Sequence, residues 1–306
     1  MNLELARDIL AWHAAHMQTG MPLPLSDCAR PEDTHQDDTA ASVLAACRSM
    51  GFVEDDVQLL ARAWAAQTAR TGRMDPAAWP DAPQDFGVNT GPCTDAFAPC
   101  PQRLGLYAVL PDAAWVGRMA RAGVPTLQLR FKSDDRDAIA REVKAAVRAV
   151  QGTGSLLFIN DHWREAIDAG AYGVHLGQED LEGARDHLQS IRAAGLRLGL
   201  STHGYAELLR AESVAPSYLA LGAVYATTLK RMATAPQGPG RLGAYARLMR
   251  HRPLVAIGGI DHARLAEVLP SGVGSVAVVR ALVAASNPEA EARRFMDRLP
   301  QGQEAA

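Results

Sequence analysis

The sequence has no long apolar run and no excess of charge of either sign. Its 306 residues include 31 Lys and Arg against 34 Asp and Glu, a formal net charge of −3. General nucleic-acid binders carry a concentrated basic surface, so we expect no nucleic-acid partner. Charged residues interrupt the apolar positions near the N-terminus, and no stretch approaches the roughly 20 apolar residues of a membrane span. We therefore expect a cytoplasmic protein without a membrane partner.

Cysteines are also few, and no two of them form a CxxC pair. All four precede residue 101, at Cys28, Cys47, Cys93 and Cys100, and the last two have no His nearby. This spacing supports a metal site only weakly, and disulfides are rare in a reducing cytosol. We expect free thiols.

The first 103 residues differ in character from the rest. Helical spacing recurs within residues 1–70, at 2–17, 39–49 and 54–70. We predict a helical extension there. Residues 71–103 hold many prolines and glycines, which preclude a long regular element and indicate a linker. Because every candidate site residue lies beyond residue 104, we expect residues 1–103 to be dispensable for the chemistry.

Part of the extension, residues 35–64, resembles the C-terminal end of hydroxymethylpyrimidine phosphate kinases of the ribokinase-like class. Those kinases present a glycine-rich anion hole just before their final helices. Residues 35–39 here read His-Gln-Asp-Asp-Thr, and the two carboxylates would repel a phosphate. The extension is therefore either a degenerate remnant of a pyrimidine kinase, without kinase activity, or a plain helical extension.

Beyond residue 104, short apolar runs alternate with segments of helical spacing. The runs lie at residues 106–110, 126–130, 156–160, 173–176, 196–201, 218–222, 254–258 and 275–279. The helical segments between them include 113–122, 134–150, 181–193 and 244–251. This alternation predicts a compact (β/α)₈ TIM barrel over residues 104–298, followed by a tail at 299–306. A doubly wound open sheet is the alternative, but it normally needs fewer such units.

In a (β/α)₈ barrel, functional side chains gather at the carboxyl ends of the strands. At the end of the second run, alternation along an extended chain places Gln128, Arg130 and Lys132 on one side. Two cations and an amide at one edge indicate an anion site. An edge strand kept soluble by its charges is the alternative.

Two carboxylates, Asp161 and Asp180, follow the third and fourth runs. Hard oxygen ligands from neighbouring strands suit Mg²⁺ held partly by substrate phosphates, whereas Asp at a strand end also serves as a helix N-cap. Their position beside Arg130, Lys132 and Lys230 favours the metal. Three cations and a divalent ion supply enough positive charge for a diphosphate.

A second anion site is predicted after the seventh and eighth runs. Gly258-Gly259 lies where these barrels bind phosphate through backbone N–H groups, although tight turns use the same pair. His175 and His203 close the fourth and fifth runs, and either one could instead be a satisfied core or rim histidine. Residues 226–240 are rich in Pro and Gly, and we expect them to form a mobile lid that carries Lys230.

Over about residues 104–298 the chain resembles thiamine phosphate synthases. The shared motifs are, in order, Gln-Leu-Arg-x-Lys, Ile-Asn-Asp, Gly-Val-His-Leu-Gly-Gln-Glu-Asp-Leu, Gly-x-Ser-Thr-His, Thr-Thr-x-Lys and Ala-Ile-Gly-Gly-Ile. The resemblance implies an enzyme that joins hydroxymethylpyrimidine diphosphate to thiazole phosphate, giving thiamine phosphate and pyrophosphate. It implies Mg²⁺ as the cofactor and two small-molecule substrates. The sequence leaves the oligomeric state open, and a homo-oligomer is one option.

Carried over position by position, the resemblance sorts the site residues into three groups. Those assigned to the pyrimidine diphosphate are Gln128, Arg130, Lys132, Asn160, Ser201 and Lys230, with His175 facing the ring. Those assigned to Mg²⁺ are Asp161 and Asp180, and those around the thiazole phosphate are Thr227, Thr228, Gly259, Val279 and Arg280. The implied mechanism is dissociative, with Arg130, Lys132 and Lys230 as the catalytic cations. It requires no protein nucleophile.

The sequence departs from the family pattern at His162, Ala226 and Leu229, where the family has Arg, Pro and Thr or Ser. The last change removes a hydroxyl and puts the affinity for one substrate in doubt. Two other functions stay open. One is a metal-independent thiazole tautomerase, which uses a histidine after strand five, where His203 stands. The other is a catalytically silent barrel for ligand binding or regulation. The complete set of cations and carboxylates favours the synthase.

Overall fold

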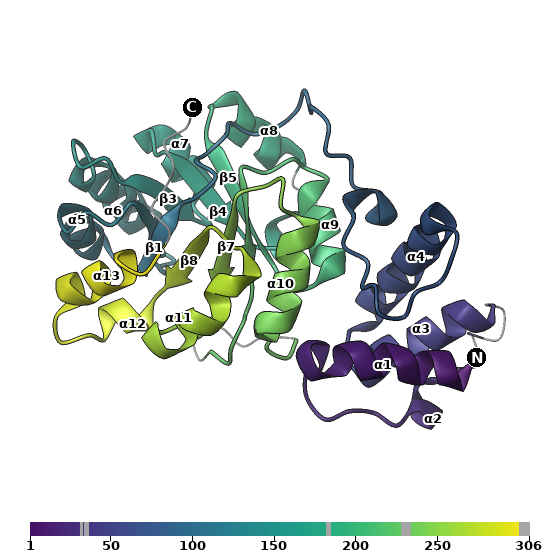
Figure 1. Cartoon of the computed structure of the whole chain (residues 1–306). Helices are drawn as coiled ribbons and strands as arrows, with labels where there is room; N and C mark the ends of the chain where they lie inside the picture. The colour runs from purple at the N-terminus through teal and green to yellow at the C-terminus, as the bar shows by residue number, and fades with distance from the viewer. Residues whose placement is uncertain (31–32, 34–36, 182–184, 228–233, 300–306) are drawn as a thin grey trace.

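The computed structural model describes residues 1–30, 33, 37–181, 185–227 and 234–299. Eight parallel strands close into a barrel in sequence order (Figure 1). The strands are β1 (Gly105–Leu110), β2 (Thr126–Leu129), β3 (Leu156–Asn160), β4 (Gly173–Leu176), β5 (Arg197–Thr202), β6 (Tyr218–Leu221), β7 (Leu254–Ile257) and β8 (Ser275–Val278). Each predicted run agrees with its strand to within one residue at either end. The (β/α)₈ prediction is confirmed.

Helices follow the strands and cover the outside of the barrel. They are α5 (Ala113–Arg121), α6 (Arg136–Ala149), α7 (Trp163–Ala169), α8 (Arg185–Ala193), α9 (Tyr205–Glu212), α10 (Gly238–Leu248), α11 (His262–Val268), α12 (Arg280–Val283) and α13 (Pro288–Met296), with 3-10 turns η3 (Glu179–Leu181) and η4 (Leu269–Ser271). The expected start of α10 at residue 244 was wrong, because the helix begins at Gly238. Pro239 fits the first turn, where a missing N–H costs nothing.

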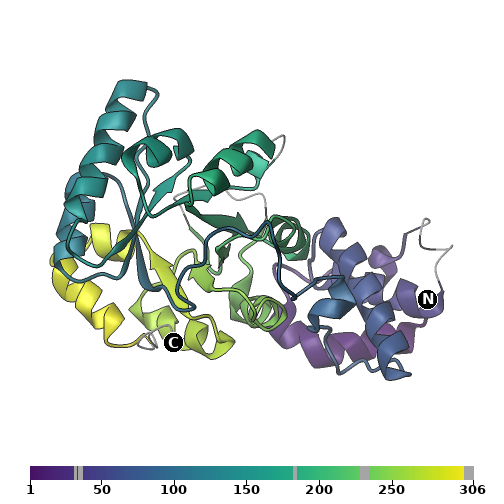
Figure 2. The same ribbon diagram turned by 90° about the horizontal axis from the view of Figure 1, so that it is seen from above.

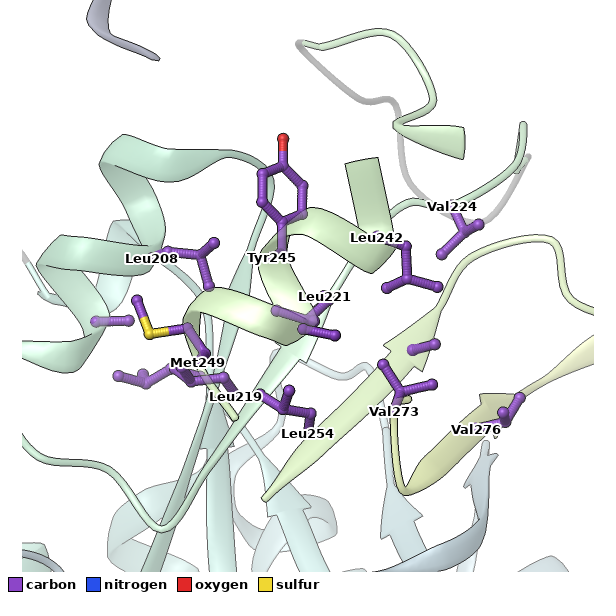
Figure 3. Packing of buried hydrophobic residues seen from close by; sticks show 14 of the residues in the cluster. Leu208, Leu219, Leu221, Val224, Leu242, Tyr245, Met249, Leu254, Val273 and Val276 are labelled. Atoms are coloured by element: carbon purple, nitrogen blue, oxygen red, sulfur yellow. The ribbon is translucent and has the colours of Figure 1, made fainter. Parts of the chain in front are cut away.

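Alternation along the strands divides the core into two layers. In β6, Tyr218 and Ala220 belong to the cluster inside the barrel, whereas Leu219 and Leu221 belong to the cluster between strands and helices. Figure 3 shows these leucines beside Leu208 of α9 and side chains of α10. Burying a leucine contributes roughly 2 kcal/mol, so this outer layer fixes the helices that follow the site strands.

Residues 3–86 form a helical unit beside α9 and α10 (Figure 2). Its elements are α1 (Leu3–Met17), α2 (Leu25–Cys28), α3 (Asp38–Ser49), α4 (Glu54–Thr71) and the 3-10 turn η2 (Pro83–Phe86). The stretch that follows runs along the barrel, where the Phe97 N–H donates to the Ala215 carbonyl. The Pro-rich stretch buries two aromatic side chains, Trp79 and Phe97. Two residues of the stretch compared with a kinase anion hole, His35 and Gln36, lie outside the described residues, and Asp37 caps α3 by accepting from the Ala40 N–H.

The four cysteines carry free thiols, with Cys28 and Cys47 buried. Among the described residues, none of the helices has the length and apolar character needed to cross a membrane.

Candidate active site

A cavity of about 630 Å³ opens at the carboxyl ends of the strands. The alternation predicted at the second strand is confirmed, because Gln128, Arg130 and Lys132 line the cavity while Leu127 and Leu129 are fully buried on the other side. This side of the mouth therefore presents two cations and an amide.

Most of the residues predicted from the sequence meet in this one cavity. The lining includes Gln128, Arg130, Lys132, Asn160, Asp161, His175, Ser201, Thr227, Gly258, Gly259, Val279 and Arg280. Thr228 and Lys230 lie outside the described residues, as does Leu229, so the lid predicted for residues 226–240 is described only at its two ends.

The two predicted metal ligands lie in different settings. Asp161 lines the cavity, and its Oδ2 lies 2.5 Å from Lys132 Nζ. Its φ of 63° is in the left-handed region, which an Asp tolerates better than most residues and which is common at functional sites. Asp180 is not among the residues that line the cavity. After β4 the lining is formed by Gly177 and Glu179, and the Asp180 Oδ2 accepts a hydrogen bond from the Gly177 N–H at 2.8 Å.

A chain of hydrogen bonds crosses the barrel interior to His175. Gln128 Nε2 donates to the Tyr107 hydroxyl at 3.1 Å, and the Tyr107 and Tyr218 hydroxyls lie 2.7 Å apart. The Tyr218 hydroxyl is 2.6 Å from His175 Nδ1, and His175 Nε2 is 2.8 Å from Ser201 Oγ. Five strands thus contribute one side chain each to a single network that ends at the cavity.

Burial sets the protonation states in this network. Desolvation lowers the pKa of His175 to about 4, which the nearby Asp161 opposes, so the imidazole is neutral at physiological pH. Desolvation also raises the pKa of Tyr107 and Tyr218, so both phenols keep their protons and can donate.

A second histidine, His203, lines the cavity at the end of β5. Its Nδ1 lies 2.6 Å from Glu207 Oε2, and the same oxygen accepts a hydrogen bond from the His203 backbone N–H at 2.9 Å. The carboxylate fixes the ring at the start of α9.

The far side of the cavity is built on close backbone contacts. Gly258 and Gly259 have φ of 107° and 64°, and a Cβ on either would overlap the chain at Ala223 or Ala226. These glycines are required for the turn. Arg264 Nη1 donates to the Gly259 carbonyl at 2.5 Å and lines the cavity.

One departure from the family pattern has a structural partner. His162 Nε2 lies 3.0 Å from the Phe131 carbonyl oxygen, so the ring joins the end of β3 to the segment that carries Arg130 and Lys132. With His in place of the family's Arg, this position therefore still connects the ends of β2 and β3.

Sequence reasoning missed Tyr107, Tyr218, Glu207 and Arg264. The tyrosines lie inside strands, where a single aromatic among apolar residues looks like core. Glu207 carried a signal, since it stands four residues after His203 on a helix and can reach back to it. Arg264 gave none, because it lies beyond the strand end, in the first turn of α11.

A closed parallel barrel that gathers cations, carboxylates and glycine turns at its carboxyl ends defines a (β/α)₈-barrel enzyme. The family model described as thiamine monophosphate synthase matches residues 106–282. The chain belongs to this family, and it is a transferase of thiamine biosynthesis.

Relatives agree with this assignment over the barrel. Thiamine-phosphate synthase of Neisseria meningitidis serogroup B is 55% identical over 199 residues, which cover 65% of this chain and 96% of the relative. The enzyme of the same name from Cronobacter sakazakii is 48% identical, covering 67% and 96%. A solved thiamine phosphate pyrophosphorylase from Pyrococcus furiosus aligns with a TM-score of 0.56 and 27% identity, covering 63% and 96%. Residues 1–103 lie outside the family match.

Proposed function

We propose that the chain joins hydroxymethylpyrimidine diphosphate to thiazole phosphate, giving thiamine phosphate and pyrophosphate with Mg²⁺ as cofactor. The observation that carries the proposal is one cavity with cations at the end of β2 and a glycine turn after β7 on the other side. The first suits a diphosphate and the second a separate phosphate. The match to synthases over the whole barrel supports the same reaction.

Asp161 and Asp180 would hold the Mg²⁺. Among the described residues no group of three or more His, Cys, Asp or Glu is placed to hold a metal ion. Mg²⁺ is commonly held by one or two carboxylates with water and substrate phosphates, so the donor chemistry fits. When bound, the ion would supply positive charge to the diphosphate.

Arg130 and Lys132 would hold the diphosphate together with Lys230, which the family motif adds. The bond between the methylene carbon and the diphosphate oxygen breaks, and its electrons leave with pyrophosphate. The aminopyrimidine ring stabilises the methylene cation, and the thiazole nitrogen then forms the new C–N bond. The chain's cations stabilise the charge that develops on the leaving group.

The buried network would fix the direction in which the Ser201 hydroxyl donates its hydrogen. Gln128 donates to Tyr107, so the Tyr107 hydrogen goes to Tyr218 and the Tyr218 hydrogen to His175 Nδ1. Neutral His175 then carries its hydrogen on Nε2 and donates it to Ser201 Oγ. The Ser201 hydrogen is left to donate to the pyrimidine substrate. Tyr107 and Tyr218 would be positioning residues for this contact.

His203 supports a second candidate, a thiazole tautomerase-like isomerase. Its ring lines the cavity and is held by Glu207, an arrangement suited to proton transfer. An assay of the full chain separates the two functions. The synthase requires the pyrimidine diphosphate, fails with the monophosphate and stops in chelator, whereas the isomerase alters the thiazole phosphate alone and without metal.

A further inference from the structure

The helical unit of the extension meets the barrel through an exchange of helix caps. Helix α9 has Gly204 at its N-cap, which offers no side chain. Asp56, from the first turn of α4, takes that place. Its Oδ1 accepts a hydrogen bond from the Ala206 N–H at 2.8 Å, and its carboxylate also bonds the Tyr205 N–H. A Cβ at Gly204 would overlap this carboxylate. The cap of a barrel helix thus comes from the extension.

The barrel returns the contact through Arg241 of α10. Its Nε donates to the Met17 carbonyl at 2.7 Å and its Nη2 to the Met50 carbonyl at 2.8 Å. These carbonyls close the C-terminal ends of α1 and α3, where a cation is favoured. The guanidinium also lies 3.6 Å from the centroid of the Phe52 ring.

Aromatic side chains of the extension also pack on Tyr205 at the start of α9. Trp79 Nε1 donates to the Tyr205 hydroxyl at 2.9 Å, and the Phe86 ring stacks on Tyr205 with an interplanar angle of 9°. On its barrel side Tyr205 packs edge-on against Tyr245 of α10 at 4.8 Å. The extension therefore fixes α9 and α10 together.

The two barrel helices that the extension contacts, α9 and α10, both start beside segments that line the cavity. Asp56 bonds the backbone N–H groups of Tyr205 and Ala206. These residues follow shortly after the end of β5, where Ser201 and His203 line the cavity. On the other helix, Gln237 N–H donates to the Ala223 carbonyl at 2.8 Å, and Ala223 also lines the cavity.

Arg241 connects Gln237, at the start of α10, to the extension. The Gln237 Oε1 accepts from Arg241 Nη1 at 3.4 Å and from the Tyr245 hydroxyl at 2.9 Å. Ala223 in turn packs against the Gly258-Gly259 turn, since a Cβ at Gly258 would lie 2.6 Å from the Ala223 Cα.

The two charges are retained although each is 2% exposed. Desolvation raises the pKa of Asp56 and lowers that of Arg241, which is the cost of burying them. Apolar side chains would join two surfaces without that cost. The two charged side chains instead provide directional hydrogen bonds to particular backbone groups.

We propose that residues 1–103 are a positioning unit of the synthase site, in which Asp56 sets the start of α9 behind Ser201 and Arg241 sets the start of α10 behind Ala223 and the Gly258-Gly259 turn. The proposal rests on the proposed function, because Ser201 is assigned to the pyrimidine diphosphate and Gly259 to the thiazole phosphate. It replaces the sequence-based expectation that these residues are dispensable.

The test uses full-length Asp56→Ala and Arg241→Lys, with Asp33→Ala as the matched control. Asp33 is also a buried carboxylate of the extension, but its ion pair with Arg48 lies wholly inside that unit. Steady-state kinetics are measured at a temperature at which circular dichroism shows every variant folded. We expect Asp56→Ala to raise the KM for the pyrimidine diphosphate roughly tenfold and Arg241→Lys to raise that for the thiazole phosphate roughly tenfold, because displacement of a site by a distant change has costs of this order.

Each variant should leave the KM for the other substrate within about twofold, and Asp33→Ala should leave both within about twofold even where it lowers the melting temperature. Kinetics of Asp56→Ala and Arg241→Lys that match Asp33→Ala would overturn the proposal, because the caps would then contribute stability alone. An equal change for both substrates would overturn it too. If the wild-type chain forms no thiamine phosphate, the proposed function fails before any variant is compared.

Discussion

At the residue scale, the proposed contact between Ser201 and the pyrimidine substrate depends on Tyr218, the phenol that bonds His175. Tyr218→Phe removes the donor to His175 Nδ1 while keeping the ring in the core. The Ser201 hydrogen then loses its fixed direction, and we expect kcat/KM for the pyrimidine diphosphate to fall roughly tenfold, the cost of about one hydrogen bond. Kinetics and ¹⁵N NMR of the His175 tautomer measure the effect.

Tyr107→Phe is the control for this prediction. It removes the partner of Gln128 but leaves the Tyr218 hydroxyl free to donate to His175. Its effect should therefore be smaller. A Tyr218→Phe variant that retains both the Nε2–H tautomer and full activity would contradict the proposed direction of the network.

The buried His175 also predicts a pH dependence of stability. Its pKa is about 4 in the folded protein, below the ordinary 6.5, so the unfolded state binds more protons between these values. The free energy of unfolding should therefore fall as the pH drops from 6.5 towards 4, with a contribution on the order of 3 kcal/mol. Denaturant titrations of the wild type and His175→Gln measure it. Parallel pH curves for the two proteins would contradict the shift.

Asp161 is the residue on which the metal proposal depends most. Asp161→Ala removes a cavity carboxylate and frees Lys132, its ion-pair partner. We expect turnover to fall roughly a hundredfold or more, with loss of the Mg²⁺ dependence. Asp180→Ala should also lower turnover sharply. Unchanged rates in chelator would count against both assignments.

At the scale of elements, the strands were predictable because a barrel strand is a short apolar run with polar residues at its end. The start of α10 was not, since Gly238, Pro239 and Gly240 resemble a loop in sequence. The structure uses them as a first helical turn, where Gly240 also lets the chain approach the His16 carbonyl.

The loop between β6 and α10 carries the element-scale prediction. Lys230 lies outside the described residues, and its role stays a prediction from the family motif. Lys230→Ala should lower turnover roughly a hundredfold by removing charge from the departing diphosphate. Lys144→Ala, an exposed lysine of α6, is the control and should act like the wild type.

Protease cleavage within residues 231–237 is a second test of the role predicted for this loop. It should slow when Mg²⁺ and pyrophosphate are added. Unchanged cleavage, together with wild-type rates for Lys230→Ala, would mean that Arg130 and Lys132 hold the diphosphate without the loop.

At the scale of the whole molecule, the sequence predicted which strand ends would meet, because parallel strands of one barrel present their carboxyl ends at one mouth. The hydrogen bonds between those ends could not be predicted. Tyr107, Tyr218 and His175 are far apart in sequence. Only the register of the strands brings the Tyr218 hydroxyl within 2.7 Å of the Tyr107 hydroxyl and 2.6 Å of His175 Nδ1.

The role proposed for the extension could not be inferred from the sequence, for a similar reason. Gly204 reads as a helix start without a cap, and Asp56 as one of several acids at the start of α4. The two are joined only when the helical unit packs on α9. A cap supplied from a distant segment leaves no local pattern in the sequence.

The central claim, that this chain forms thiamine phosphate from two phosphorylated halves, is tested most directly by product stoichiometry. The full-length protein is mixed with Mg²⁺, hydroxymethylpyrimidine diphosphate and thiazole phosphate, and both products are followed over time. The account predicts equal amounts of thiamine phosphate and pyrophosphate, and neither when one substrate is left out. Pyrophosphate release without thiazole phosphate at the same rate, or no thiamine phosphate with both substrates present, would contradict it.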